Sequence, residues 1–349
     1  MAAKQVGFCA VAACVGLAAS VALADPNGGP SVANPYGQAD VAPGEMYVGA
    51  AGGVWWMTLP GWEYGSEDIS GLPPVPKFEI EADGRLYGGQ VWAGRAIDAG
   101  PGEHTRIQLE GSYAEGDLDG RQARPDGGAN DGYILLDKSG ASIIIGDSEA
   151  KLGVDVYSWE AGLRALTDAG TDTSGALTHS LMIFGGATSQ DYDANILSGT
   201  SCPPTCFESF VRQDVDTWYI GVEAAIAVTV NLSPAATFTL GGRVAGLYFD
   251  ADMDGTDCLD TGNPADPGCS GALTSSVSDG LTAVTYRGGG FVGVNYDLGG
   301  VSVGISGTAN YLPMADLVNP LNAESSPFDL DLSHELVYGG RGSIVIPFN

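Results

Sequence analysis

The chain has 349 residues, of which 43 are acidic and 14 basic, so its formal net charge is −29 at pH 7. A charge of this sign repels phosphate backbones, which excludes a nucleic-acid partner. Because 44% of the residues are hydrophobic, the composition also excludes a disordered chain. The 53 glycines and the short apolar segments between polar stretches indicate strands joined by turns.

The N-terminus has the features of an export signal. Lys4 precedes an uncharged stretch rich in Ala, Val, Gly and Leu that ends in Ala22-Leu23-Ala24. This pattern predicts a signal peptide over residues 1–24. An uncleaved membrane anchor and lipoprotein processing at Cys14 are the alternatives. Residues 25–45 are rich in proline and glycine, which predicts a periplasmic lead-in without regular structure.

Ten segments of the remaining chain are long enough to cross a membrane as tilted strands, which takes about 9 to 11 residues. Short links follow every second segment and long links follow the others, as in a meander with periplasmic turns and extracellular loops. We therefore predict an all-β fold over residues 46–349, a transmembrane antiparallel meander β-barrel of about ten strands. The predicted strands are 46–58, 83–97, 104–117, 152–166, 177–190, 212–230, 236–250, 283–296, 301–311 and 334–348.

A further pair of apolar pieces lies within residues 133–145, on either side of Asp137-Lys138-Ser139-Gly140. Each piece is too short to span a membrane, so we interpret the pair as a hairpin above it. If both pieces extended into the bilayer, the barrel would have twelve strands.

Apolar and polar residues alternate within the predicted strands, as where Trp218, Ile220 and Val222 alternate with Thr217 and Glu223. A soluble sandwich would show the same period with its apolar face inward. Three features favour apolar residues that face lipid: aromatic residues near the strand ends, an apolar face almost without charge, and an alternating C-terminal run. The aromatic residues are Trp55, Trp56, Trp218, Tyr219, Tyr248, Phe249, Tyr296, Tyr311 and Phe348.

With this terminal run the sequence resembles bacterial outer-membrane barrel proteins in general, whose last strand typically ends on an aromatic residue. Here Asn349 follows Phe348, so the motif lies one residue from the usual position. The resemblance identifies no particular family. It implies export to the bacterial outer membrane, contact with its lipid and lipopolysaccharide, and recognition of the last strand by the barrel-assembly machinery.

Charged side chains are costly toward lipid, so the alternation places those of the predicted strands in the lumen. In one interpretation they form a ladder of paired Arg and Glu that fills a narrow barrel. In the other they line a water-filled path and select solutes. The predicted lumen residues are Arg106, Gln108, Glu110, Glu160, Arg164, Glu223, Arg243, Arg287, Glu335 and Arg341.

The link that begins at Asp250 resembles the start of a calcium-binding loop. Asp250, Asp252 and Asp254 occupy positions one, three and five, and Gly255 occupies position six. Position twelve is Thr261 instead of the usual Glu. The segment is therefore a weak Ca²⁺ candidate in a predicted extracellular loop, and an ordinary solvated acidic loop is the alternative. No other cofactor is predicted.

Four cysteines lie beyond the signal peptide as two local pairs, Cys202 with Cys206 and Cys258 with Cys269. An even number in an oxidising compartment predicts two loop disulfides. A metal site at Cys202 and Cys206 is the alternative, but zinc requires four nitrogen or sulfur ligands and the sequence supplies no nearby His.

The sequence contains no phosphate loop or dinucleotide fingerprint, and no serine or paired-aspartate motif surrounds His104, His179 or His334. We therefore predict that the chain is not an enzyme. The architecture favours a porin-like passive channel for small solutes. The alternative is a non-conducting surface barrel whose acidic loops bind a partner, a divalent cation or lipopolysaccharide.

Overall fold

The computed structural model describes residues 44–64, 78–100, 103–124, 132–137, 140–145, 148–172, 175–198, 207–260, 273–318 and 329–348. The predicted signal peptide and almost all of the lead-in lie outside these residues. All regular elements in the described ranges are β-strands. These ranges contain no helix that is long and apolar enough to span a bilayer.

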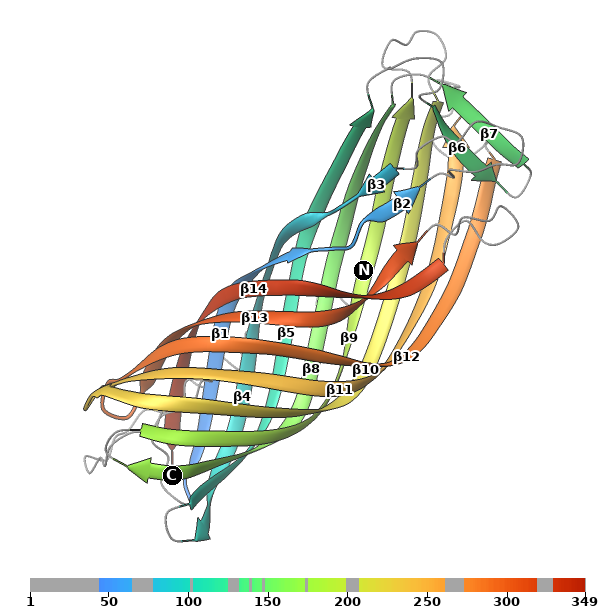
Figure 1. Ribbon diagram of the computed structural model, residues 1–349. Helices are drawn as coiled ribbons and strands as arrows, with labels where there is room; N and C mark the ends of the chain where they lie inside the picture. Colours follow the sequence, from blue (N-terminus) through green and yellow to red (C-terminus); the bar gives the residue numbers. More distant parts are fainter. Residues whose placement is uncertain are drawn as a thin grey trace.

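Ten antiparallel strands close into one barrel (Figure 1), which confirms the predicted meander. The first strand pairs with the last, so that Met46 lies opposite Phe348. The barrel strands are β1 (Met46–Thr58), β4 (Asp83–Gly100), β5 (Glu103–Arg124), β8 (Ser148–Asp172), β9 (Gly175–Ser198), β10 (Phe207–Ser233), β11 (Ala236–Asp260), β12 (Leu273–Asp297), β13 (Ser302–Val318) and β14 (Asp329–Phe348).

Four short strands form two hairpins apart from the barrel wall. β6 (Gly132–Asp137) pairs only with β7 (Gly140–Ile145), so the twelve-strand alternative is wrong and the predicted separate hairpin is confirmed. β2 (Trp62–Tyr64) pairs with β3 (Phe78–Ile80). This second hairpin lies in a link that we predicted to be a loop, and its three-residue strands are too short to show a periodic pattern.

The barrel strands are much longer than a bilayer requires. β10 has 27 residues, whereas a transmembrane strand needs about 9 to 11. The upper ends of six strands, β5 and β8 to β12, occupy parts of the chain that we predicted to be long loops. Residues 250–257, the predicted acidic loop, are part of β11. Their frequent Asp and Gly suggested a loop, but here these residues form a polar outer face.

Exposed aromatic residues mark one boundary of the membrane. At this level eight strands each place one aromatic side chain, 40% to 55% exposed, on the outside of the barrel. Below them, toward the short turns, the outer face carries exposed Leu109, Leu163, Ile183 and Ile226. The apolar faces therefore point to lipid, as predicted. The aromatic girdle comprises Trp56, Tyr87, Trp159, Trp218, Tyr248, Tyr286, Tyr311 and Tyr338.

The two faces of the strands exchange polarity at this girdle. In β10 below Trp218, Ile220 and Val222 face outward and Glu223 faces inward. Above it the same strand directs Arg212, Asp214 and Asp216 outward and buries its apolar side chains inside. The period of two continues unchanged while the outer medium changes from lipid to water. A barrel that rises above the membrane therefore needs an apolar interior there.

Apolar side chains fill the barrel above the girdle and form the outer core, which includes Leu118, Val156, Phe249 and Met253. The β2–β3 hairpin contributes Trp62, Phe78 and Ile80 to it, and each of these is at most 2% exposed. The indole nitrogen of Trp62 donates a hydrogen bond to Oε1 of Gln213 on β10, at 3.2 Å. The hairpin thus fixes the upper half of the barrel from within.

The exchange of polarity predicts that a charge on the outer face of a strand lowers the free energy of unfolding below the girdle but has little effect above it. Val244 and Thr256 both face outward on β11, below and above the girdle. Val244→Lys should lower the free energy of unfolding by about 2 to 4 kcal/mol, because the ammonium faces lipid. Thr256→Lys, the matched control, should change it by less than about 0.5 kcal/mol. Urea unfolding in lipid vesicles measures both, and equal costs would contradict the assignment of the boundary.

Candidate functional site

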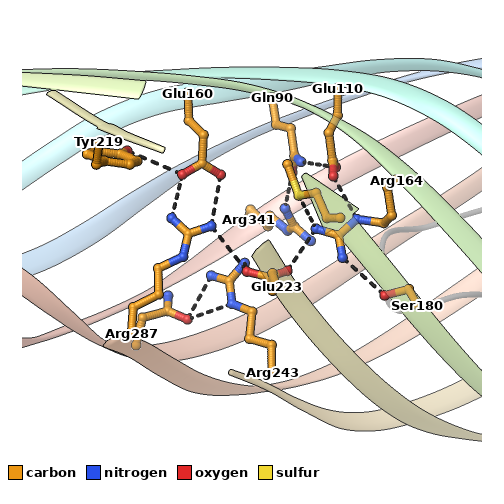
Figure 2. A network of polar contacts seen from close by, with 12 residues as sticks. Gln90, Glu110, Glu160, Arg164, Ser180, Tyr219, Glu223, Arg243, Arg287 and Arg341 are labelled. Carbon is orange, nitrogen blue, oxygen red and sulfur yellow. Dashed lines mark hydrogen bonds and ion pairs between the residues drawn. The ribbon is translucent and has the colours of Figure 1, made fainter. Parts of the chain in front are cut away.

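The site with the most functional groups lies in the lumen below the girdle, and Glu223 is its centre (Figure 2). The Glu223 side chain is fully buried and faces three guanidinium groups. Arg164 donates to Oε1 at 2.9 Å and Arg287 donates to Oε2 at 3.1 Å. Arg243 lies 3.7 Å from Oε2. One carboxylate from β10 therefore joins β8, β11 and β12 across the barrel.

Arg164 uses its whole guanidinium fork. Its Nε donates to Glu110 at 2.6 Å, one terminal nitrogen donates to the Ser180 hydroxyl at 3.1 Å, and the other lies 2.9 Å from the sulfur of Met182. These partners come from β5 and β9. The planar fork of arginine suits such divergent contacts better than lysine would.

Arg287 forms a two-pronged pair with Glu160, and its second nitrogen lies 3.1 Å from Oε1 of Glu160. Tyr219 also donates to this carboxylate, at 3.2 Å. The guanidinium carbon of Arg287 lies 3.9 Å from the ring centre of Phe184, a cation–π contact. Burial of this cation is thus compensated by two carboxylates and an aromatic face.

Polar side chains extend these contacts to the remaining strands. Gln90 of β4 donates to Glu110 at 3.0 Å and accepts from Arg341 of β14, which donates to Ser306 of β13 at 3.1 Å. Tyr47 of β1 donates to Gln108 at 2.9 Å. All ten barrel strands contribute to this lumen network. It comprises Tyr47, Gln90, Gln108, Glu110, Glu160, Arg164, Ser180, Met182, Tyr219, Glu223, Arg243, Arg287, Ser306, Asn310 and Arg341.

Two predicted lumen residues lie outside this network. Arg106 pairs with Asp168 at 2.6 Å, and Thr178 donates to the same carboxylate at 2.6 Å. Asp168 was missed because we placed it in a short turn. Glu335 lies above the girdle, where burial and the charge of Glu81 raise its pKa. The polar inward residues Gln90, Ser306 and Asn310 were not among the predicted lumen residues, which were all charged except Gln108.

The network surrounds a small cavity. A cavity of about 20 Å³ lies between Gln90, Glu110, Glu160, Arg164 and Arg243. This volume holds about one water molecule. The charges are paired with one another across the lumen, as in the first of the two interpretations given above, and the described side chains form a polar layer above which the outer core begins.

The calcium candidate does not have the geometry of a cation loop. Asp250, Asp252 and Asp254 are alternate residues of one strand, so neighbouring members are about 7 Å apart along it. Asp250 accepts hydrogen bonds from Trp218 at 2.8 Å and from Thr282 at 2.5 Å. Within the described residues, no group of three acidic, His or Cys side chains could hold a metal. The loop assignment is wrong, and calcium binding stays a prediction.

The predicted disulfides cannot be assessed from the described side chains. Cys202, Cys206 and Cys269 lie outside the described residues. Cys258 belongs to β11, but its side chain is not among those described. Both disulfides therefore stay predictions.

The acidic row, a line of five aspartates directly opposite one another on adjacent strands, crosses the outer face above the girdle. Like charges in direct cross-strand pairs are destabilising. Partial burial raises the pKa of Asp214, and the charges of Asp191, Asp216 and Asp254 raise it further. The acidic row consists of Asp117, Asp155, Asp191, Asp214 and Asp254, on β5 and β8 to β11.

Comparison with known proteins does not assign the chain to a particular protein family. No protein-family model and no curated protein matches the sequence. The solved outer membrane protease OmpT from Escherichia coli is similar at 12% identity over 89% of this chain and 99% of that one, with a TM-score of 0.44. The translocator domain of the autotransporter NalP from Neisseria meningitidis matches at 12% identity over 87% and 88%, with a TM-score of 0.32. A FadL homologue from Pseudomonas aeruginosa matches at 8% identity over 87% and 90%, with a TM-score of 0.23.

These likenesses are too distant to transfer any activity. The lipid-facing belt, the aromatic girdle and the closed even-stranded meander define the architecture on their own: the chain is an outer-membrane β-barrel.

Removing the central carboxylate should destabilise the barrel strongly. Glu223→Gln keeps the shape of the side chain but leaves three guanidinium groups around a neutral amide. We expect the free energy of unfolding to fall by about 3 to 5 kcal/mol. Arg121→Gln breaks a pair 2.8 Å long with Glu149 in which Arg121 is 64% exposed, and should cost less than about 1 kcal/mol. Similar losses in the two variants would show that the network does not hold the strands together.

The acidic row should make stability depend on pH in a defined direction. The pKa of Asp214 is higher in the folded state, so its unfavourable ionisation destabilises the fold above that pKa and this penalty disappears as the pH falls through it. Asp214→Asn should therefore raise the melting temperature at pH 7, and the gain should vanish near pH 4. The control Asp193→Asn removes a partner of Arg212 3.6 Å away and should give no gain. A gain from Asp214→Asn that persists unchanged at pH 4 would contradict the assignment.

Proposed function

We propose that the chain is a non-conducting outer-membrane barrel that holds a folded structure outside the membrane. The observation that carries the proposal is that the interior is occupied at two successive levels. The lumen network fills the level of the membrane, and the outer core with the β2–β3 hairpin fills the barrel above it.

A porin-like conduit, the function that the architecture alone favoured, needs a continuous aqueous path between these levels. In a conducting pore, charges line water and attract or repel passing ions. Here Arg164, Glu223 and Arg287 are bonded to one another and almost inaccessible to solvent. A water path would also have to cross buried Trp62 and Phe78. Both layers support a closed lumen.

The exposed surfaces support a role at the cell surface. Six strands rise above the girdle with a polar outer face, and the acidic row lies on this wall. We propose that membrane lipid covers the belt and that this wall meets lipopolysaccharide or a protein partner. The aromatic Phe348 ends the last strand, opposite Met46, and supports the proposed recognition by the assembly machinery.

We assign no catalytic role to the histidines. His179 faces outward below the girdle, and the ring of His334 stacks against those of both Tyr286 and Tyr311. Nε2 of His334 lies 3.0 Å from the Thr285 hydroxyl, and none of the contacts between described residues pairs either of these two histidines with an acid.

Conductance in planar lipid bilayers tests this proposal. The purified full-length chain should insert without producing stable current steps, and vesicles that contain it should not swell in small sugars. Folding is verified by different migration of the unheated and the heated protein on a gel, and insertion by flotation of the protein with lipid vesicles. Stable current steps whose size changes in Arg243→Ala would overturn the closed-lumen proposal and would favour a porin-like conduit.

A further inference from the structure

β12 loses one of its two neighbours above the girdle. Its pairing with β11 continues up to Leu273, whereas its pairing with β13 stops at Gly288, opposite Tyr311. We call the point where β12 and β13 diverge the fork. Above it, none of the described strands pairs with the β13-facing edge of β12. In Figure 1 strands β13 and β14 end lower than the tip of β12. Among the described strands, the upper part of β12 is therefore paired on one side only.

The upper part of β13 buries apolar side chains from both of its faces, as a segment that packs inside the barrel would. Met314, Ala315 and Leu317 are at most 7% exposed and belong to the outer core. The backbone N–H of Leu330 donates to Asp279 of β12 at 2.7 Å. Pro313 would lie opposite Tyr286 if the pairing continued, and proline has no N–H to donate. The upper part of the hairpin thus packs against the outer core and does not pair with the β12 edge.

His334 closes the lower end of the fork and shows which backbone groups face it. Its Nε2 lies 3.1 Å from the carbonyl oxygen of Tyr286, and its ring is stacked 4.7 Å from that of Tyr286. The carbonyl of Tyr286 therefore points into the fork. Alternate residues of a strand direct their backbone groups to the same side. Thr282 and Val284 must present their N–H and C=O groups to the same edge.

Residues 280–284 of this edge lack the sequence features that protect exposed strands. Edge strands usually carry Pro, Lys or a bulge, or are covered. Residues 280–284 read Gly-Leu-Thr-Ala-Val, and their pairing with β11 has no bulge. Val284 is 85% exposed, more than any other large apolar side chain of the described residues. The edge is thus suited to accept another strand.

Acidic side chains flank the edge on the outer face. Asp250 lies opposite Thr282, and Asp252 lies opposite Gly280. A Cβ atom built on Gly280 would be 3.4 Å from Oδ1 of Asp252, so this carboxylate leans over β12 toward the β13-facing edge. A lysine on an added strand could reach it across the small residue. The aspartates singled out as a calcium candidate therefore favour a basic partner here.

We propose that the edge of β12 from Gly280 to Val284 is a docking site for an extended, basic segment of a partner protein outside the membrane. The segment would add as a strand, with backbone hydrogen bonds to Thr282 and Val284 and a lysine near Asp252. The site lies on the outer wall, so the proposal holds whether or not the lumen conducts.

A synthetic nine-residue peptide of alternating lysine and valine or threonine tests the proposal, with the full-length protein in lipid nanodiscs. Fluorescence anisotropy should show saturable binding, and hydrogen exchange at Thr282 and Val284 should slow. The same peptide with alternate N-methylated amides should bind at least about tenfold more weakly, because two ladder bonds are lost.

Variants at two positions distinguish peptide binding at the β12 edge from nonspecific binding elsewhere on the protein. Val284→Pro removes a donor that faces the fork and keeps the pairing with β11; it should weaken binding at least about tenfold, whereas Val284→Thr should bind as the wild type does. Asp252→Asn should weaken the lysine peptide but not a peptide with serine in place of lysine.

Equal binding of the methylated peptide, or wild-type affinity in a folded Val284→Pro variant, would overturn the proposal. So would slow exchange at Thr282 and Val284 without peptide, which would mean that the chain covers its own edge. A dimer that is lost in Val284→Pro would identify a second copy as the occupant and contradict the basic partner.

Discussion

A side chain on a barrel strand can point only outward or inward, and the outer medium changes from lipid to water at the aromatic girdle. This constraint organises the whole molecule. Below the girdle the outer face must be apolar, so the polar residues that the strands carry turn inward. Above it the outer face is polar and the apolar residues turn inward, as β10 shows on the two sides of Trp218. One unbroken strand thus has a membrane half and a water half.

The lower interior follows from the same constraint. Charges that cannot face lipid are held at the axis, where each must be compensated because the desolvation penalty is large. Glu223 meets this requirement with three arginines, and the network reaches every strand of the wall. Above the girdle, apolar side chains that cannot face water are buried in the interior instead. The β2–β3 hairpin packs among them and fills part of the remaining space. The two fillings are stacked along the barrel, and among the described strands the wall is incomplete beside the upper part of β12.

Much of the fold could be predicted from the sequence because alternation and link lengths are local signals. The ten strands and the separate hairpin at 133–145 were predicted correctly, and Arg164 and Glu223, which the alternation assigned to the lumen, are buried in the lumen network. The upper strand ends were missed because outward aspartates and glycines there resemble a loop, as at Asp252 and Gly255. Pairings such as Arg287 with Glu160, 127 positions apart, depend on strand register and curvature, which no local pattern encodes. The fork beside β12 likewise arises from long-range packing of the β13–β14 hairpin.

Solid-state nuclear magnetic resonance of the full chain in bilayers, with magnetisation transferred from water or from lipid, tests the central claim most directly. Along β10 we expect lipid transfer at Ile220, Val222 and Ile226, fast water transfer at Asp214 and Asp216, and slow transfer from both at Val215 and Glu223. Water transfer to Glu223 and Arg164 as fast as to Asp214 would reveal a hydrated lumen and contradict the account.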